Sequence, residues 1–408
     1  MSTSAETEQP FIEPSEFHIF DPRVVEDFWR QVNHLRNTCP VGWSDQLWSD
    51  YDSGYWFIND FANAQKAGAN WRLFSSANGA APVQFDLDIM RMIPLETDPP
   101  MHRDIRKALN PFFTQEAMSA QEPRVAEIVE RLMERCLAQA ADGTVDFIAE
   151  FTRRLPPLVF FEGFLGQKEE DIDWILEVLE VLLAAPERAL EVVPRLLFWD
   201  AELLESRRAE GRRDDMAGII AHLGDADGLE LDERERVETL NLMMMAGMET
   251  TMGGLASVAY VLAESPDARK LLRDADDELL DSAVDEFLRH ASPVTGAGRT
   301  MTEDAEVGGC PMKAGDRVLI NWAAANHDPA QFENPDELIF DRENAASHVA
   351  FGAGIHRCLG NHLARREVKA MIRAVCNLST FDMEPGFTPS FRASMARGPL
   401  SLPVRMAR

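Results

Sequence analysis

Apolar residues recur every three or four positions through most long segments between about Met101 and Cys376, as in DDELLDSAVDEFLRHASP. This spacing places the apolar side chains on one face of a helix, and short Gly, Pro and Asp turns separate the segments. Strand-like runs are fewer and shorter, and they lie at residues 54–60, 316–324 and 400–406. The pattern predicts a mainly α fold with small accessory sheets.

The longest predicted helix begins after Asp232, a good N-cap residue, and ends where Ser265 and Pro266 stop it. Its middle, AGMETTMGG, contains three glycines and two threonines. Each of these residues is less favourable than Ala inside a helix by up to about 1 kcal/mol. We therefore infer that something other than helix stability selects them, because glycine also permits close approach and local opening of the hydrogen-bond ladder.

The composition excludes some partners. The formal net charge of −29 argues against nucleic acid, because phosphate binding needs surplus Lys and Arg. Hydrophobic residues make up 45% of the 408 positions, an ordinary globular balance. The sequence has no fixed repeat, low-complexity tract or evident linker, so we expect one continuous domain over residues 1–408.

The cysteines and the N-terminal residues indicate a compartment. Five cysteines lie far apart without any C-x-x-C pair: Cys39, Cys136, Cys310, Cys358 and Cys376. This arrangement suggests neither a zinc site nor a disulfide framework, and a reducing compartment fits it best. The opening MSTSAETEQPF lacks the apolar run of a secretory signal, and no stretch approaches the length that spans a bilayer. We expect a cytoplasmic protein that does not bind membranes.

The segment FGAGIHRCLG places Cys358 among Gly352, Gly354 and Gly360, just before a predicted amphipathic helix. The glycines allow the backbone to bend tightly and to approach a flat ligand. A sulfur at the N-terminal end of a helix is favoured as thiolate, and a thiolate is a metal ligand. Taken alone, the same cysteine is equally compatible with a small buried side chain in a loop.

The surrounding residues resemble the haem-binding signature F-x-x-G-x-H-x-C-x-G of the cytochrome P-450 monooxygenases, with matches at Phe351, Gly354, His356, Cys358 and Gly360. The resemblance implies a single-domain, helix-rich triangular prism with small β-sheets. It also implies haem b (iron protoporphyrin IX) with Cys358 as the iron ligand. The implied activity is insertion of one atom of O2 into an apolar C–H bond.

Three further segments are similar to motifs of the same family. Ala246, Gly247, Glu249 and Thr250 match its A-G-x-[DE]-T segment, which implies cofactor contact by Ala246 and Gly247 and catalytic proton delivery by Glu249 and Thr250. In isolation, a threonine hydroxyl bonded to a helix carbonyl would explain Thr250 as well. The resemblance also assigns the structural E-x-x-R set and the haem-propionate donors: Glu286, Arg289 and Arg342; His102, Arg106, Arg299 and His356. Gly352 completes the cofactor-binding segment.

Offsets from these motifs give a nearly apolar substrate pocket: Phe85, Leu242, Met245, Ala246, Val294, Thr295 and Met395. We expect a small hydrophobic substrate, with a terpenoid or aromatic skeleton as the suggestion, although core packing explains the methionines equally well.

The chain lacks a dinucleotide fingerprint and iron–sulfur cysteine spacing, so electrons must come from a separate donor. We expect an acidic ferredoxin with its reductase to dock on a basic patch, and the protein itself to be a monomer. The residues of this patch are Arg103, Lys107, Arg357, Arg365, Arg366 and Lys369. The alternatives are a peroxide-driven oxygenase, a haem sensor without catalysis, and an all-helical interaction protein without a cofactor.

Overall fold

The computed structural model describes residues 9–48, 54–81, 90–141, 143–167, 172–184, 188–225, 229–391 and 396–408. Helices dominate this part of the chain, as the apolar spacing predicts. Their bounds are α1 Pro22–Glu26, α2 Phe28–Thr38, α3 Phe61–Ala69, α4 Met101–Leu109, α5 Gln115–Ala140, α6 Leu155–Phe160, α7 Asp173–Ala184, α8 Ala189–Ala209, α9 Met216–Ala221, α10 Glu233–Glu264, α11 Pro266–Arg273, α12 Asp277–Ala291, α13 Trp322–Asn326 and α14 Asn361–Cys376.

The strands form three small sheets. One has the order β1-β2-β8-β5-β3, the second β4-β10-β9, and the third is the hairpin β6-β7. The strand bounds are β1 Val41–Ser44, β2 Tyr55–Ile58, β3 Phe74–Ser75, β4 Val145–Asp146, β5 Ala297–Met301, β6 Ala305–Val307, β7 Cys310–Met312, β8 Arg317–Ile320, β9 Thr380–Met383 and β10 Pro403–Ala407. All neighbouring strands in the first sheet are antiparallel except β2 and β8, which pair in parallel from Trp56↔Val318 to Ile58↔Ile320.

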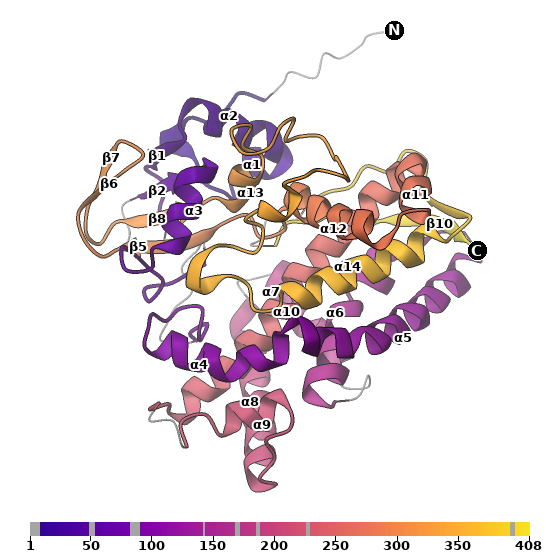
Figure 1. The fold of residues 1–408 in the computed structure, drawn as a ribbon, viewed down its shortest axis with the longest axis horizontal. Coiled ribbons are helices and arrows are strands. Elements are labelled where there is room, and N and C mark those ends of the chain that lie inside the picture. Colours follow the sequence, from indigo (N-terminus) through magenta and orange to yellow (C-terminus); the bar gives the residue numbers. More distant parts are fainter. Residues whose placement is uncertain are drawn as a thin grey trace.

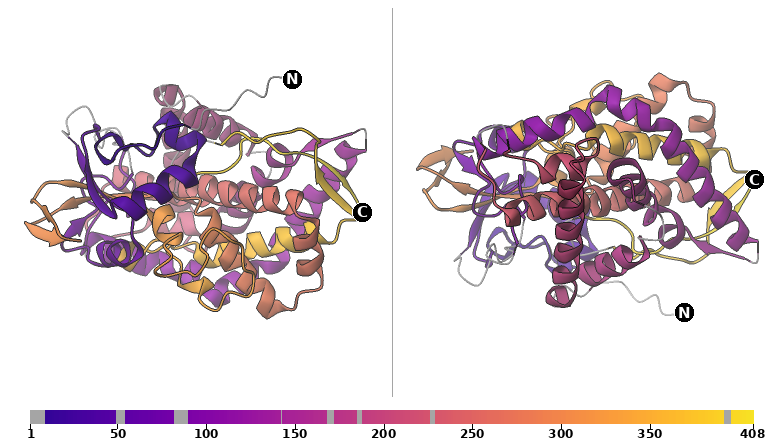
Figure 2. Two further views of the ribbon diagram at one scale, coloured as in Figure 1. Left: turned by 90° about the horizontal axis from the view of Figure 1, so that it is seen from above. Right: turned by 90° about the horizontal axis from the view of Figure 1, so that it is seen from below.

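The first sheet and most of the long helices occupy different sides of the molecule. Figure 1 shows the first sheet at the left with α3 beside it, and α5, α12 and α14 toward the right, where β10 of the second sheet also lies. In both views of Figure 2, α10 runs through the middle of the helical side, with the other helices around it. The largest apolar cluster lies in this helical part, whereas two smaller clusters pack on the sheet and beneath α2.

Local signals set the ends of α10 as the sequence predicts. Asp232 caps the helix by accepting a hydrogen bond from the Glu235 amide, and the Glu235 side chain accepts one from the Asp232 amide in return. The helix ends before Ser265, whose side chain caps the next helix. No helix in the described part of the chain combines the length and apolarity needed to cross a lipid bilayer.

The strand predicted over residues 316–324 is half wrong. β8 stops at Ile320, and α13 begins at Trp322. The side chain of Asn321 accepts a hydrogen bond from the Ala324 amide at 3.0 Å and so caps a helix that the apolar run conceals. A short apolar run is compatible with either a buried strand or a buried helix, and here a cap in its middle divides it.

Candidate functional site

The segment around Cys358 folds as a tight loop before α14. The Cys358 amide donates a hydrogen bond to the Phe351 carbonyl at 2.8 Å, and the Asn361 side chain donates one to the Cys358 carbonyl at 2.9 Å. Gly354 has a φ of 70°, and a Cβ there would lie 2.3 Å from the Gly68 carbonyl oxygen in α3. Only glycine fits this position, because both the backbone conformation and the close contact exclude a side chain.

The Cys358 side chain is accessible although protein atoms crowd around it. It is exposed, yet desolvation by the surrounding protein raises the pKa of its thiol. Nearby Gly360 has open space on the side where a Cβ would project. The loop thus leaves its sulfur accessible to a ligand.

The sequence argument that the helix N-terminus favours a thiolate is incomplete. The Gly360 amide and the cations Arg106, Arg365 and Arg357 do act to lower the pKa of the Cys358 thiol, but desolvation is larger and the net pKa is raised. Metal ligands lose their protons when the metal binds, since the ion supplies the missing positive charge. The chain alone therefore does not hold this sulfur as a thiolate.

Four residues predicted to hold carboxylates gather beside the thiol. The His102 and His356 rings lie edge to face with centroids 4.4 Å apart. Arg299 and Arg106 both contribute to lowering the pKa of His356, after burial, and burial lowers the pKa of Arg299 to about 10. These four side chains come from α4, β5 and the Cys358 loop, so tertiary folding collects them.

This cluster has hydrogen-bond donors without acceptors. Among the described residues, neither ring nitrogen of His356 has a hydrogen-bond partner, although both are buried. Within the described residues, Arg106 and Arg299 form no ion pair; Arg299 donates only to the Gly298 carbonyl. Buried donors need partners, and buried cations need anions. A ligand that carries carboxylates beside an iron atom, as haem b does, meets both needs and fits these residues.

The segment of α10 that carries the second motif faces accessible space. Ala246 is exposed although it lies in the middle of the longest helix. The Thr250 hydroxyl donates to the Ala246 carbonyl at 2.8 Å. The helix is regular through Gly247, so the local opening suggested by its glycines is not present; a Cβ at Gly247 would make only an ordinary contact, 3.6 Å from Phe160.

Glu249 lines a small cavity of about 30 Å³. Met252 and Gly253 of the same helix and Arg153 of a neighbouring segment also line it. The wall opposite α10 is the chain near residues 396–400, and it approaches closely: a Cβ at Gly253 would lie 2.9 Å from the Arg397 carbonyl oxygen. Gly253 therefore serves close packing, one of the two reasons proposed for the glycines of this helix, whereas a Cβ at Gly254 would make only an ordinary contact, 3.6 Å from Pro293.

The structure describes four of the predicted pocket residues besides Ala246. Leu242 is buried, whereas Met245 and Val294 are partly exposed. Val294 forms an isolated β-bridge with Ala396. Thr295 is 2% exposed, and its hydroxyl has no hydrogen-bond partner in the part of the chain that the structure describes. The other two predicted pocket residues, Phe85 and Met395, lie outside the described residues.

The predicted structural set is assembled as a buried ion-pair network. Arg289 donates to both oxygens of Glu286 at 2.7 and 2.8 Å, and Arg342 donates to the same carboxylate at 2.9 Å. Burial alone would raise the pKa of Glu286, but hydrogen bonds and charge from Arg289, together with a bond from Arg342, hold it below its usual value. Glu286 and Arg289 are fully buried.

Sequence reasoning missed three residues that join this network to the cysteine loop. Arg289 donates to the carbonyl of Asn326, whose side chain accepts from the Val349 amide at 2.8 Å. Asp285 accepts hydrogen bonds from Arg365 at 2.7 Å and from His348 at 3.3 Å. None of these residues belongs to a recognised motif. The only indication in the sequence was that Asp285 directly precedes Glu286 of the predicted network.

The predicted docking patch is largely neutralised. Arg365 pairs with Asp285, Arg366 with Glu122, and Lys369 with Asp277 and Asp281. Arg103 pairs with its neighbour Asp104. Lys107 and Arg357 are exposed and form no ion pair with any described residue. The sequence could not reveal the partners of Arg365, Arg366 and Lys369, because those carboxylates come from α5 and α12.

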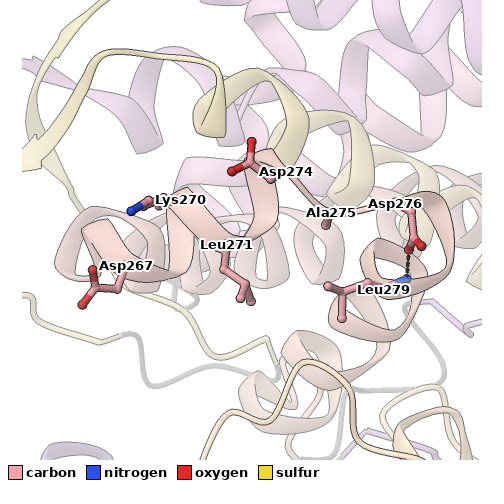
Figure 3. Close-up of a pocket in the computed structure, with 7 residues that line it drawn as sticks. All are labelled: Asp267, Lys270, Leu271, Asp274, Ala275, Asp276 and Leu279. Carbon is pink, nitrogen blue, oxygen red and sulfur yellow. Dashed lines mark hydrogen bonds between the residues drawn. The ribbon is translucent and has the colours of Figure 1, made fainter.

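A larger hollow of about 580 Å³ lies elsewhere on the surface, between α11 and α12, and Figure 3 shows its lining. Its walls include Asp267, Asp274 and Asp276, and Asp276 caps α12 by accepting from the Leu279 amide. None of the predicted site residues lines it. Its size therefore does not make it the functional site; the chemistry gathers at Cys358.

Comparison with known proteins gives a consistent assignment. A family model described as cytochrome P-450 matches residues 200–392. The cytochrome P-450 monooxygenase PikC of Streptomyces venezuelae is 35% identical over 321 residues, which cover 77% of this chain and 76% of the relative. Vitamin D(3) 25-hydroxylase of Pseudonocardia autotrophica is 33% identical over 329 residues, which cover 79% of each chain.

Solved structures agree with the sequence relatives. A cytochrome P-450 of Mycobacterium marinum, solved in complex with pseudoionone, superimposes with a TM-score of 0.83 at 25% identity, covering 93% of this chain and 94% of that one. The helix-rich fold, the loop around Cys358 and these relatives lead to one conclusion. The chain belongs to the cytochrome P-450 family and is a monooxygenase that depends on haem b.

Proposed function

We propose that residues 1–408 act as one monooxygenase domain in which the Cys358 sulfur is the iron ligand, and that the substrate is a small hydrophobic molecule. The accessible, desolvated position of this thiol beside unpaired cations supports the ligand assignment. The bound haem would supply the oxidising chemistry, and the thiolate would push electron density toward cleavage of the O–O bond. The residues of the chain would position the cofactor and the substrate, deliver protons and select the substrate.

Arg106, Arg299, His102 and His356 would hold the two propionates of the cofactor. Burial lowers the pKa of His102 to about 4, and Arg106 adds to that effect. Both histidines would therefore act as neutral N–H donors, and the two guanidinium groups would provide the charge. Because β5 and α4 each contribute donors, the cofactor would tie the sheet side of the fold to the helical side.

Glu249 and Thr250 would deliver protons to the reaction space. The Thr250 hydroxyl can turn from the Ala246 carbonyl toward the pocket and accept from a neighbour as it donates. Glu249 lines the small cavity that also contains Arg153, and we propose that its carboxyl carries the proton to Thr250 Oγ1. A glutamate reaches one methylene further than an aspartate, which suits an acid that starts on the side of that cavity.

The proposed substrate follows from the described pocket wall. Leu242, Met245, Ala246 and Val294 are apolar, which favours a hydrocarbon skeleton of terpenoid or aromatic type. The unpartnered hydroxyl of Thr295 offers one hydrogen bond, so we propose that the skeleton carries a single polar group. Relatives named for vitamin D3 and solved with pseudoionone support a mainly hydrophobic ligand.

Electrons would come from a ferredoxin and its reductase. Lys107 and Arg357 provide the exposed cations that an acidic protein would meet beside the cysteine loop. The paired residues Arg365, Arg366 and Lys369 would mainly stabilise α14, a change from the patch that the sequence suggested. Charge reversal at Lys107 and Arg357 together should lower the rate of electron transfer and its salt dependence.

The accessible Cys358 thiol within a cluster of unpaired donors is the observation that carries this proposal. The test is the spectrum of the reduced protein with carbon monoxide, for the unaltered chain and for Cys358→Ala. We expect the thiolate-type Soret shift only with Cys358 present, whereas Cys310→Ala should keep it. A normal shift in Cys358→Ala, or none in the unaltered chain, would refute the assignment.

A further inference from the structure

Two cysteines other than the proposed iron ligand lie near one another. Cys39 follows the last residue of α2, and Cys310 is the first residue of β7. Each sulfur lies 3.5 Å from the same oxygen, the carbonyl of Val41 at the start of β1. The two sulfurs are therefore separated by no more than twice that distance. Figure 1 shows the β6–β7 hairpin beside β1.

The surrounding backbone holds the two segments together. A Cβ at Gly308, in the hairpin turn, would lie 2.6 Å from the Val41 side chain, and a Cβ at Gly42 would lie 2.5 Å from the Cys39 sulfur. These distances show that the hairpin turn packs directly against β1 and that β1 packs directly against Cys39. Desolvation, followed by the neighbouring Cys310 thiol, raises the pKa of Cys39, which agrees with their proximity.

Small molecules can reach this pair. Both side chains are partly exposed, and their neighbours Thr38, Pro40 and Gly309 are exposed. In contrast, Cys136 and Cys376 are buried, and Cys358 is the proposed iron ligand. Rotation about χ1 can move either cysteine sulfur away from the Val41 carbonyl and toward the other sulfur, because side chains change between staggered rotamers. Bond formation then brings the sulfurs to about 2.05 Å.

We infer that Cys39 and Cys310 form a reversible disulfide bond when they meet a small disulfide such as oxidised glutathione. One thiol loses its proton and attacks oxidised glutathione, forming a mixed disulfide and releasing one glutathione thiolate. The second thiol loses its proton, attacks the protein sulfur of the mixed disulfide and releases the second thiolate. The two protein thiols are oxidised, one oxidised glutathione is reduced to two glutathione molecules, and the two protons complete the balance.

The bond would join the end of α2 to the β6–β7 hairpin, between positions that are distant in the sequence. Cross-links of this kind restrict the unfolded chain, so oxidation is expected to raise the melting temperature. The inference is independent of the proposed function, because neither cysteine contributes to the Cys358 site. The pair could not be predicted from the sequence, because the spacing of the two cysteines matches no motif.

The experiment equilibrates the haem-loaded protein with mixtures of oxidised and reduced glutathione. Free thiols are blocked, the protein is digested without reductant, and the peptides are analysed by mass spectrometry. We expect a cross-linked peptide pair containing Cys39 and Cys310 that disappears in excess reduced glutathione, together with a melting temperature several degrees higher for the oxidised form. The unaltered protein suffices, so no variant needs to fold.

Single substitutions test whether Cys39 and Cys310 are responsible for the cross-link and for the higher melting temperature. Cys39→Ser and Cys310→Ser should each abolish both the cross-link and the gain in melting temperature, whereas Cys376→Ala should retain both. The inference is overturned if the two thiols remain free throughout, if each only accumulates a glutathione adduct, or if a cross-link forms equally well after either serine substitution.

Discussion

The Asp285 carboxylate accepts a hydrogen bond from Arg365 Nε at 2.7 Å, which joins α12 to the helix that follows the cysteine loop. The same carboxylate lies 3.3 Å from His348 Nε2, on the other side of that loop. The Arg365 guanidinium also lies 4.5 Å from the centre of the Phe351 ring. One side chain of α12 thus contacts residues before and after Cys358 and fixes the loop between them.

Asp285→Asn should weaken this connection. Asparagine keeps the shape but removes the charge that faces Arg365 and His348, and Asp285 is only 14% exposed as a side chain. We expect a loss of about 1–3 kcal/mol in the free energy of unfolding and a faster loss of haem. Asp281→Asn, on the exposed face of the same helix, is the control and should change neither. Equal stability of the two variants would show that Asp285 does not fix the loop.

Glu286→Gln should be more damaging. The substitution leaves Arg289 and Arg342 buried without a carboxylate, and breaking a buried ion pair costs about 3–5 kcal/mol. The measurement is the yield of folded, haem-containing protein. Glu278→Gln, at the exposed start of α12, should give a normal yield. A normal yield from Glu286→Gln would contradict a structural role for the network.

Asp200 should make stability depend on pH. Burial raises its pKa from 3.8 to about 8, and Asn241 gives it one hydrogen bond at 2.9 Å. The folded state therefore keeps a proton that the unfolded chain releases, so this group's contribution to stability falls as pH rises through the window from about 4 to about 8. The limit of this loss is about 5 kcal/mol.

Asp200→Asn removes that titration. Unfolding measured at pH 5 and at pH 8 should show a smaller difference for the variant than for the unaltered protein, with the variant relatively more stable at pH 8. Asp277→Asn serves as an exposed control, since ion pairs lower rather than raise the pKa of Asp277. If the difference in stability between pH 5 and pH 8 is the same for the variant and the unaltered protein, then Asp200 is ionised in the folded state.

Thr250→Ala should lower product formation through loss of the hydroxyl that bonds to Ala246. Positioned proton donors contribute about 10²–10⁴-fold to rate, and we expect a loss toward the lower limit because water can partly substitute. The measurement is product formed per electron transferred. Thr250→Ser keeps the hydroxyl and should keep most of the activity, as should Thr251→Ala. Full activity in Thr250→Ala would exclude the proposed role.

Thr295→Val should change selectivity rather than folding, because the hydroxyl that it removes has no partner. Titration of the haem spin state with matched hydrophobic compounds, with and without one hydroxyl group, gives the two affinities. We expect affinity for the hydroxyl compound to fall about 3- to 10-fold and affinity for the other to hold or rise. A parallel change for both compounds would place the Thr295 hydroxyl away from the ligand.

Local patterns predicted several features correctly. The ends of α10 follow from a cap at Asp232 and a stop at Ser265, both of which depend on a few adjacent residues. Apolar spacing likewise predicted most helices, because a helix exposes its periodicity in the sequence. The apolar run at residues 316–324 was ambiguous for the same reason, since the Asn321 cap that divides it resembles any other polar residue in a turn.

The family could be recognised from the sequence, and so could Cys358 as the proposed iron ligand and the side chains proposed to bind carboxylates, because each motif depends on residue type and on spacing within one short segment. Only the tertiary structure decided the partners. Asp285 meets Arg365, Glu122 meets Arg366, and Cys39 meets Cys310 across long separations in the chain. Charge pairing and thiol proximity depend on distances in space, and packing of α5, α12 and the sheet sets those distances without leaving a local signal.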